Sequence, residues 1–224
     1  MAVNTQTVVD KDVFRVDRVR YLPGGAYVLR FSRNGIQFVP GQYLVMGVEG
    51  SRQRREYSIY SGIQDPYLEV LIREVEDGFV SRQLKQAKPG DVLQVVGPRG
   101  FFLTRARSDP DASFLFLATG TGIAPYHSFI RSYPDVDYQL IHGIRTMEEA
   151  YDMEDYSPGR YHACTSREIG SVYEGRITDY MVNHTLDPAR DIYLCGNGGM
   201  IADVMDILFA REFPRHRIFT EAYF

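Results

Sequence analysis

The chain has 224 residues, of which 44% are hydrophobic and 24% charged, a balance that excludes a disordered or fibrous protein and accommodates one large domain or two small ones. The net charge of −4 is unevenly distributed, because residues 1–107 carry 16 Lys and Arg against 11 Asp and Glu, whereas residues 108–224 carry 9 against 18. Two cysteines and five scattered histidines exclude a disulfide framework and a zinc or iron–sulfur centre, so we expect no metal site.

Short alternating segments separated by turns dominate the first half of the chain. They predict six strands, at 14–21, 26–32, 42–48, 56–61, 68–74 and 92–96. One predicted helix, at 79–86, interrupts the series. Six strands at a spacing of about ten residues are typical of an antiparallel barrel or sandwich.

A longer rhythm of strands and helices follows in the second half. Apolar runs predict strands at 114–118, 138–142, 161–165, 192–195 and 217–222. Between and beside them, helices are predicted at 123–133, 147–156, 177–183 and 199–212. This alternation predicts a parallel sheet with helices on both faces. A polar, turn-forming segment at 105–111 marks the boundary between two predicted domains, 1–107 and 108–224.

One apolar stretch tests whether the chain crosses a membrane. Residues 112–130 contain no Asp, Glu, Lys or Arg, but Thr119-Gly120-Thr121-Gly122 and Pro125 interrupt the stretch. It therefore predicts a strand, a turn and a helix start instead of a membrane span. The first twelve residues lack the apolar core of a signal peptide, so we expect a cytoplasmic protein.

Two glycine turns each follow an apolar strand and open a helix. The first is Gly120-Thr121-Gly122 with Pro125, and the second is Cys195-Gly196-Asn197-Gly198-Gly199-Met200. Glycines allow the backbone to approach a phosphate closely, and a helix N-terminus donates amide hydrogens to it. Either turn alone is equally consistent with an ordinary strand–helix connection. Two such turns in one parallel sheet predict a crevice that binds a dinucleotide.

Three arginines and a serine follow the strands of the predicted nucleotide domain. They are Arg145, Ser166, Arg167 and Arg176. Guanidinium groups bind phosphate in a bidentate fashion, so the set suits the 2′-phosphate of NADP. The alternative explanation is that these arginines are ordinary solvated surface residues. That explanation accounts less well for three arginines together than for a single one.

A cation, an aromatic ring and hydroxyls share one strand of the first domain. Period-two alternation places Arg55 and Tyr57 on one face and Ser58 on the other. Arg73 ends a later strand, and the helix start contributes Gly78, Phe79, Val80 and Ser81. Together these residues predict a pyrophosphate site beside a ring that stacks on Tyr57, although an ordinary basic strand edge is the alternative.

Five motifs occur in the order found in the plant-type ferredoxin–NADP⁺ reductase superfamily. They are Arg55-Glu56-Tyr57-Ser58, Gly78…Ser81, Gly120-Thr121-Gly122…Pro125, Cys195-Gly196-Asn197 and Thr220-Glu221-Ala222-Tyr223-Phe224. The resemblance spans nearly the whole chain and is strongest to the bacterial ferredoxin/flavodoxin–NADP⁺ reductases. It implies an FAD-binding antiparallel β-barrel followed by an NADP-binding α/β domain.

The resemblance also implies residue roles in hydride transfer between NADP(H) and FAD. Ser58 donates a hydrogen bond near the flavin N5, Cys195 packs against the nicotinamide C4, and Glu221 relays protons. Tyr223 and Phe224 cover the flavin faces, although several bacterial relatives carry Trp in place of Phe224. With the motifs above, the residues expected to bind FAD are Arg55, Tyr57, Ser58, Arg73, Gly78, Phe79, Val80, Ser81, Thr121, Tyr223 and Phe224. Those expected to bind NADP(H) are Gly120, Gly122, Pro125, Arg145, Ser166, Arg167, Arg176, Gly196 and Met200.

The family resemblance implies that the electron partner is a separate acidic protein, ferredoxin or flavodoxin. The basic first half suits such a partner, with a candidate rim of Arg52, Arg54, Lys85, Lys88 and Arg99. Chance is the alternative explanation of the charge asymmetry. Two other functions stay open: a flavin reductase or oxygenase reductase component, and a non-catalytic nucleotide-binding subunit of an electron-transfer complex. We expect a monomer that binds neither nucleic acid nor membrane.

Overall fold

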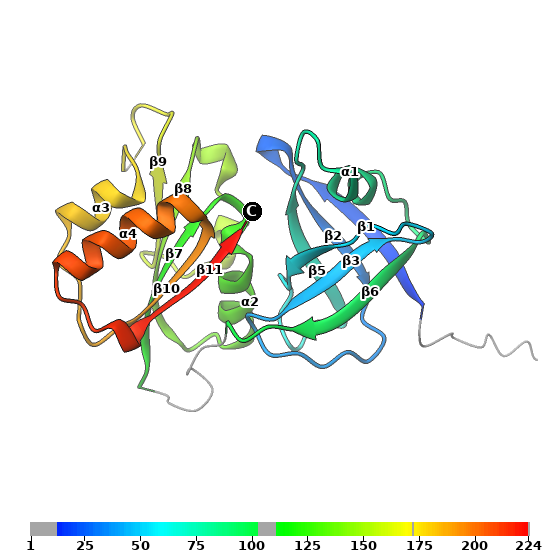
Figure 1. Ribbon diagram of the computed structural model, residues 1–224, viewed down its shortest axis with the longest axis horizontal. Coiled ribbons are helices and arrows are strands. Elements are labelled where there is room, and N and C mark those ends of the chain that lie inside the picture. The colour runs from blue at the N-terminus through cyan, green and yellow to red at the C-terminus, as the bar shows by residue number, and fades with distance from the viewer. Residues whose placement is uncertain (1–12, 103–110, 172, 224) are drawn as a thin grey trace, which may run out of the picture.

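Two lobes lie side by side, one built on an antiparallel sheet and the other on a parallel sheet (Figure 1). The computed structural model describes residues 13–102, 111–171 and 173–223. The predicted domain boundary at residue 107 therefore lies outside the described residues, as does Phe224. The architecture of an antiparallel lobe followed by an α/β lobe is the predicted one.

The first lobe is a six-stranded antiparallel barrel. Its strands are β1 (Phe14–Tyr21), β2 (Ala26–Ser32), β3 (Tyr43–Val48), β4 (Arg55–Ser58), β5 (Tyr67–Arg73) and β6 (Val92–Arg99). They follow the order β4-β3-β6-β1-β2-β5. The ends of this sheet meet where Ile59 bridges Val70 and the amide of Tyr60 donates to the carbonyl of Glu69 at 2.7 Å. This closure ends β4 at Ser58, three residues earlier than the alternation predicts.

A short helix and a tight turn complete the barrel. Helix α1 (Phe79–Lys85) buries Val80 and Leu84 among the barrel's apolar side chains. The 3₁₀ turn η1 (Pro23–Gly25) connects β1 to β2. These apolar side chains and the inward-facing residues of the strands form a buried core. All residues of this core belong to the first lobe.

The second lobe is a five-stranded parallel sheet. Its strands are β7 (Ser113–Thr119), β8 (Asp137–Ile144), β9 (Tyr161–Thr165), β10 (Asp191–Asn197) and β11 (Ile218–Tyr223). They follow the order β11-β10-β7-β8-β9. From β7, the chain adds β8 and β9 on one side of the sheet and then β10 and β11 on the other side. The carboxyl ends of β7 and β10 are thus the switch point where such sheets bind ligands.

Helices cover both faces of the parallel sheet, as the alternation predicts (Figure 1). Helix α2 (Ala124–Ser132) lies on the face toward the barrel, whereas α3 (Ile177–Asn183) and α4 (Gly198–Ala210) lie on the opposite face. Along β7, Phe114 and Phe116 pack toward α2, and Leu115 and Leu117 pack toward α3 and α4. A strand buried on both faces explains the continuous apolar run in this part of the sequence.

The two lobes share a buried core. Barrel residues Val28 and Tyr60 belong to the same apolar cluster as Phe116, Tyr126 and Tyr193 of the second lobe. Among the described residues, no helix is long and apolar enough to cross a membrane.

The predicted helix at 147–156 is wrong. The chain forms two 3₁₀ turns there, η3 (Met147–Glu149) and η4 (Met153–Asp155), because Asp152 has a left-handed conformation with φ of 49°. The predicted helix at 123–133 also begins differently, since the 3₁₀ turn η2 (Gly120–Ile123) precedes α2. A fifth 3₁₀ turn, η5 (Arg215–Arg217), leads into β11.

Candidate functional site

The two glycine turns lie side by side at the carboxyl ends of β7 and β10. The Asn197 amide donates to Thr119 Oγ1 at 2.8 Å, which ties the second turn to the first. The Asn197 side chain then caps α4, because its Oδ1 accepts from the amides of Gly199 at 2.9 Å and Met200 at 3.2 Å. The sequence reasoning treated Asn197 as a turn residue and missed this capping role.

Glycines in the two turns serve different purposes. A Cβ atom on Gly122 would lie 2.7 Å from the carbonyl carbon of Cys195, so a side chain there would push the turns apart. A Cβ atom on Gly198 would meet nothing within 4 Å, and one on Gly120 would meet only Arg73 Nη1, at 4.0 Å. The backbone beneath the crevice is therefore close-packed, while the crevice above Gly120 and Gly198 has room for a ligand.

A cavity of about 520 Å³ opens at these turns and extends over the ends of β8 and β9. Its wall includes residues predicted for NADP(H), namely Gly120, Arg145, Ser166, Arg167, Arg176 and Met200. Gly122, Pro125 and Gly196 are buried beneath the turns and are not part of that wall. Arg73, which the sequence reasoning assigned to FAD, reaches the same cavity from the barrel.

The arginines of this cavity carry largely uncompensated charge. In the part of the chain that the structure describes, Arg73, Arg167 and Arg176 have no carboxylate within ion-pair distance, and Arg145 Nε only reaches Glu149 Oε1 at 4.0 Å. Four guanidinium groups around one cavity repel one another, and a phosphorylated ligand would relieve that repulsion. The donor set therefore fits a dinucleotide with an additional phosphate.

Side chains from both lobes meet in a second cluster, formed by Ser58, Cys195, Glu221 and Tyr223. The Tyr223 hydroxyl donates to Ser58 Oγ at 2.6 Å, and Ser58 Oγ donates to Glu221 Oε1 at 3.1 Å. Cys195 on β10 pairs in register with Glu221 on β11, so their side chains share one face of the sheet. Ser58 belongs to the barrel, so the cluster spans the junction between the two lobes.

Burial changes the acid–base properties of this cluster. Burial raises the pKa of Glu221 to about 7. The hydrogen bond from Ser58 lowers this pKa, and the nearby charge of Glu56 raises it by a smaller amount. Burial also raises the pKa of the Cys195 thiol well above its usual value, so Cys195 is a thiol and not a nucleophilic thiolate at neutral pH. Glu221 can thus exchange a proton near neutral pH, whereas Cys195 contributes packing.

The side chains of Tyr57 and Ser58 lie on opposite sides of β4, as the sequence predicts, although burial along the strand does not alternate strictly. Ser58 is buried and faces Glu221, while Tyr57 packs against the barrel interior and Arg55 is exposed. Burial raises the pKa of Tyr57 to about 12, although the nearby Arg55 charge partly opposes this. The Arg55 side chain donates to the neighbouring carbonyl of Arg54 at 2.9 Å and has no carboxylate partner among the described residues. An exposed, uncompensated guanidinium beside an aromatic ring suits an anionic ligand with a planar group.

The start of α1 is built by its own side chains. Ser81 Oγ accepts from the Val75 amide at 3.2 Å and donates to the Gly78 carbonyl at 3.2 Å. A Cβ atom on Gly78 would lie 2.7 Å from Ser81 Oγ, so this turn requires glycine. Val80 is buried, and Phe79 is half exposed. The Ser81 hydroxyl and Val80 side chain are therefore engaged inside the protein, and only the backbone amides and Phe79 remain for a ligand.

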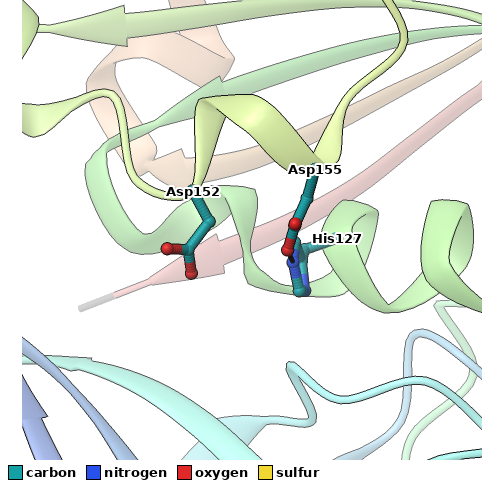
Figure 2. Close-up of side chains that lie close together, drawn as sticks. All are labelled: His127, Asp152 and Asp155. Carbon is teal, nitrogen blue, oxygen red and sulfur yellow. Dashed lines mark hydrogen bonds and ion pairs between the residues drawn. The ribbon is translucent and has the colours of Figure 1, made fainter.

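A third cluster, which the sequence reasoning missed, ties the lobes together through barrel contacts of His127 and Asp152. Figure 2 draws these two side chains with Asp155, which also belongs to the second lobe. Asp152 accepts from both terminal nitrogens of Arg20, at 2.8 and 2.6 Å, and from the Tyr60 hydroxyl at 2.7 Å. The His127 ring stacks on Tyr60 with a centroid distance of 3.7 Å, and its Nε2 lies 2.9 Å from Asp155 Oδ2. Asp152 and Asp155 lie in the segment that was wrongly predicted as a helix, so no periodic signal pointed to them.

The geometry of this third cluster gives it a structural role. His127, Asp152 and Asp155 present ligand atoms within 4.8 Å of one another, the spacing of a metal site. However, His127 Nδ1 lies 2.7 Å from the Tyr60 carbonyl and Nε2 lies beside a carboxylate, and both of these partners only accept hydrogen bonds. The His127 imidazole therefore joins Asp155, within the second lobe, to the Tyr60 carbonyl of the barrel, and the ion pair that crosses between the lobes is Arg20–Asp152.

We expect Asp152→Ala to lower the free energy of unfolding by about 3 kcal/mol, because the substitution leaves the Arg20 charge and the Tyr60 hydroxyl without their shared partner. Urea denaturation measures the change. Asp206→Ala is the matched control, since Asp206 is an exposed helix residue with no hydrogen bond or ion pair in the described structure. Equal stability of the two variants would contradict the structural role of the cluster.

Both lobes match known oxidoreductase domains. Residues 26–103 match the oxidoreductase FAD-binding domain, and residues 116–206 match the oxidoreductase NAD-binding domain. The first match covers most of the barrel, including β4 and α1. The second covers both glycine turns and Arg145, Arg167 and Arg176 of the cavity, whereas Arg73 lies within the first match.

Whole-chain comparisons agree with these domain matches. The chain is 30% identical over 215 residues to the flavodoxin/ferredoxin–NADP reductase of Shigella flexneri, covering 84% of this chain and 86% of that one. It is also 30% identical over 206 residues to the electron transfer component of toluate 1,2-dioxygenase from Pseudomonas putida, covering 86% of this chain and 60% of that relative. A ferredoxin NADP⁺ reductase from Neisseria gonorrhoeae, solved with bound FAD and NADP, shares the fold with a TM-score of 0.84 at 23% identity, covering 95% of this chain and 98% of that one. The chain therefore belongs to the ferredoxin–NADP reductase family of flavoprotein oxidoreductases, with an FAD-binding domain followed by an NAD-binding domain.

Proposed function

We propose that this protein exchanges electrons between NADP(H) and a one-electron carrier protein, ferredoxin or flavodoxin, through bound FAD. The observation that carries the proposal is the hydrogen-bonded chain Tyr223–Ser58–Glu221, which joins the two lobes beside the buried Cys195. FAD supplies the chemistry that connects a two-electron hydride donor to a one-electron acceptor. The protein supplies binding, orientation and proton handling.

The proposed FAD site lies on the barrel. Arg55 offers an uncompensated charge to the diphosphate, and Tyr57 offers a ring to the planar group. The amides at the start of α1 and the half-exposed ring of Phe79 supply further proposed contacts to FAD. Roles for Thr121 and Phe224 in holding FAD stay predictions, and Phe224 lies outside the described residues.

The proposed NADP(H) site is the cavity over the two glycine turns. Arg167, Ser166 and Arg176 form its far end, where they suit the adenosine 2′-phosphate. Arg73 reaches the cavity from the barrel beside Gly120, and Arg73 and Arg145 suit the diphosphate. The acidic net charge of residues 108–224 does not attract this ligand, so the local arginines and the turn amides must do so.

Ser58, Glu221 and Tyr223 have separate proposed roles at the lobe junction. Ser58 Oγ holds a proton between Tyr223 and Glu221, and the raised pKa of Glu221 lets its carboxyl take up or release a proton near neutral pH. The ring of Tyr223 lies against Ser58 and Cys195 and must move before a nicotinamide can approach them. Cys195 stays protonated and sets the shape of the site.

Exposed basic residues of the barrel support an acidic protein partner. Arg52 and Arg54 are exposed on the barrel, and Arg99 lines an open cavity of about 1030 Å³ that also contains Glu221. Lys85 contributes less than the sequence predicts, since its Nζ pairs with Glu74 Oε2 at 2.5 Å. We also predict that the protein is cytoplasmic and monomeric.

A second candidate function is the reductase component of an oxygenase. The similarity to the toluate 1,2-dioxygenase component favours it, at the same 30% identity as the similarity to the Shigella reductase. The chain covers 60% of the dioxygenase component and 86% of the reductase, so the whole-length correspondence favours the reductase.

Cytochrome c reduction by NADPH distinguishes these candidates. We expect purified protein to reduce cytochrome c slowly alone and at least about tenfold faster with added ferredoxin or flavodoxin, because the carrier transfers electrons to the cytochrome. If NADH and an added oxygenase strongly stimulate electron transfer, and neither ferredoxin nor flavodoxin has an effect, the second candidate is favoured. Rapid reduction of free FMN that no carrier protein stimulates would indicate a flavin reductase.

A further inference from the structure

A buried histidine that the proposed chemistry does not use lies directly beneath the first glycine turn. His142 on β8 has no solvent exposure, and its Nε2 lies 2.8 Å from the carbonyl oxygen of Gly120. Its other nitrogen, Nδ1, lies 2.8 Å from the hydroxyl of Tyr161 on β9. The neighbouring strands present Ala118 and Ala163 in register with His142, which leaves room for the imidazole.

The partners of His142 determine its protonation. A carbonyl oxygen only accepts, so Nε2 carries a proton and donates it to Gly120. The Tyr161 hydroxyl then donates to the unprotonated Nδ1, and the three groups form a directed chain from Tyr161 through His142 to Gly120. In the described structure, the other titratable side chain facing the imidazole is Tyr151, with a ring centroid distance of 6.2 Å. Burial lowers the pKa of His142 to about 4 and raises that of Tyr151 to about 12, so both groups are neutral at physiological pH.

Fixing the Gly120 carbonyl also fixes the amide that follows it. The peptide bond is planar and trans, so the N–H of Thr121 points in the direction opposite to the Gly120 carbonyl. Gly120 has a φ of +52°, in the left-handed region that glycine enters at little steric cost, and because glycine lacks a Cβ atom its backbone is weakly restrained except by the hydrogen bond to His142. The Thr121 amide belongs to the first turn of η2, whose leading amides have no partner inside the helix.

We propose that Tyr161 and His142 are positioning residues that hold the Gly120–Thr121 peptide so that its N–H faces the diphosphate of the bound dinucleotide. The proposal rests on the proposed NADP(H) site. His142 and Tyr161 do not touch the ligand in this assignment. They act through the Gly120 carbonyl, which His142 holds on the buried side of the turn, while Gly120 itself borders the cavity.

Isothermal titration of FAD-loaded protein with two probes tests this role. NADP⁺ contains the diphosphate, whereas adenosine 2′-monophosphate contains only the part recognised by Arg167 and its neighbours. We expect His142→Leu to weaken NADP⁺ binding about tenfold and to leave adenosine 2′-monophosphate binding within about twofold, because one charge-assisted hydrogen bond to the diphosphate is lost. His142→Gln should restore most of the NADP⁺ affinity, since its amide nitrogen occupies the place of Nε2 and donates to Gly120.

Two further variants control for general disruption. Tyr161→Phe preserves the aromatic packing but removes the donor to Nδ1, so it should weaken NADP⁺ binding by about threefold. His184→Leu is the matched control, because the exposed His184 ring after α3 contacts Tyr180, through its carbonyl and its ring, and does not line the cavity. Equal losses of both probes in His142→Leu, or unchanged NADP⁺ binding in all variants, would overturn the positioning role. If the wild-type protein binds neither probe, the proposed NADP(H) site itself is wrong, and the positioning role is rejected with it.

Discussion

Replacing Ser58 by alanine is expected to slow the reduction of bound FAD by NADPH about 100-fold. The substitution breaks the only hydrogen-bonded path between Tyr223 and Glu221 in the described structure, and loss of a positioned proton donor costs about two orders of magnitude or more. Stopped-flow measurement of the loss of flavin absorbance reports this step directly. Unchanged rates would show that Ser58 has no part in the reaction.

The same measurement as a function of pH separates proton handling from simple positioning. Because the pKa of Glu221 is about 7, the wild-type rate should change through this pH with the protonation of one carboxyl group. The Ser58 hydrogen bond lowers that pKa, so Ser58→Ala should move the transition to higher pH. Glu56→Gln is the matched control with the opposite sign, since removing the Glu56 charge should move the transition to lower pH. Glu221→Gln should abolish it.

Replacing Arg167 by alanine is expected to raise the KM for NADPH about 50-fold while leaving kcat and the KM for NADH nearly unchanged. Arg167 has no carboxylate partner in the described structure, so its charge is available to a phosphate, and a charged hydrogen bond of this kind is worth about 2 kcal/mol. Steady-state kinetics with both nucleotides measure the effect. A rise in KM without a fall in kcat indicates that the lost interaction of Arg167 stabilises the bound substrate and the transition state equally.

The control for Arg167 is Arg215→Ala. Arg215 lies in η5, where its guanidinium is 4.4 Å from the centre of the Phe209 ring and it does not line the cavity. It should affect neither nucleotide. Equal losses for NADPH and NADH in Arg167→Ala would contradict a 2′-phosphate site at this end of the cavity.

Local patterns in the sequence predict most of the fold. The alternation in the barrel and the apolar run of β7 are properties of single segments, so the strands appear within a few residues of their predicted limits. The glycine turns likewise follow from local spacing. The segment 147–156 was misread because its residues have helical propensity, while the left-handed Asp152 and its ion pair with Arg20 depend on a contact 132 residues away.

The candidate site shows the same division between local and distant information. The motifs predict that Ser58 and Glu221 are important, but their hydrogen bond joins positions 163 residues apart and depends on how the two lobes meet. Arg73 reaches the nucleotide cavity from the barrel, a placement that its position at a strand end does not reveal. His142 offers no periodic or motif signal, because its partner Gly120 lies on a neighbouring strand end.

Anaerobic titration with NADPH tests the central claim most directly. Purified protein should be yellow, should contain about one FAD per chain, and should lose its flavin absorbance on addition of about one equivalent of NADPH, since one hydride reduces one flavin. A colourless protein that cannot be reconstituted with FAD would contradict the account. So would a yellow protein whose absorbance NADPH does not change.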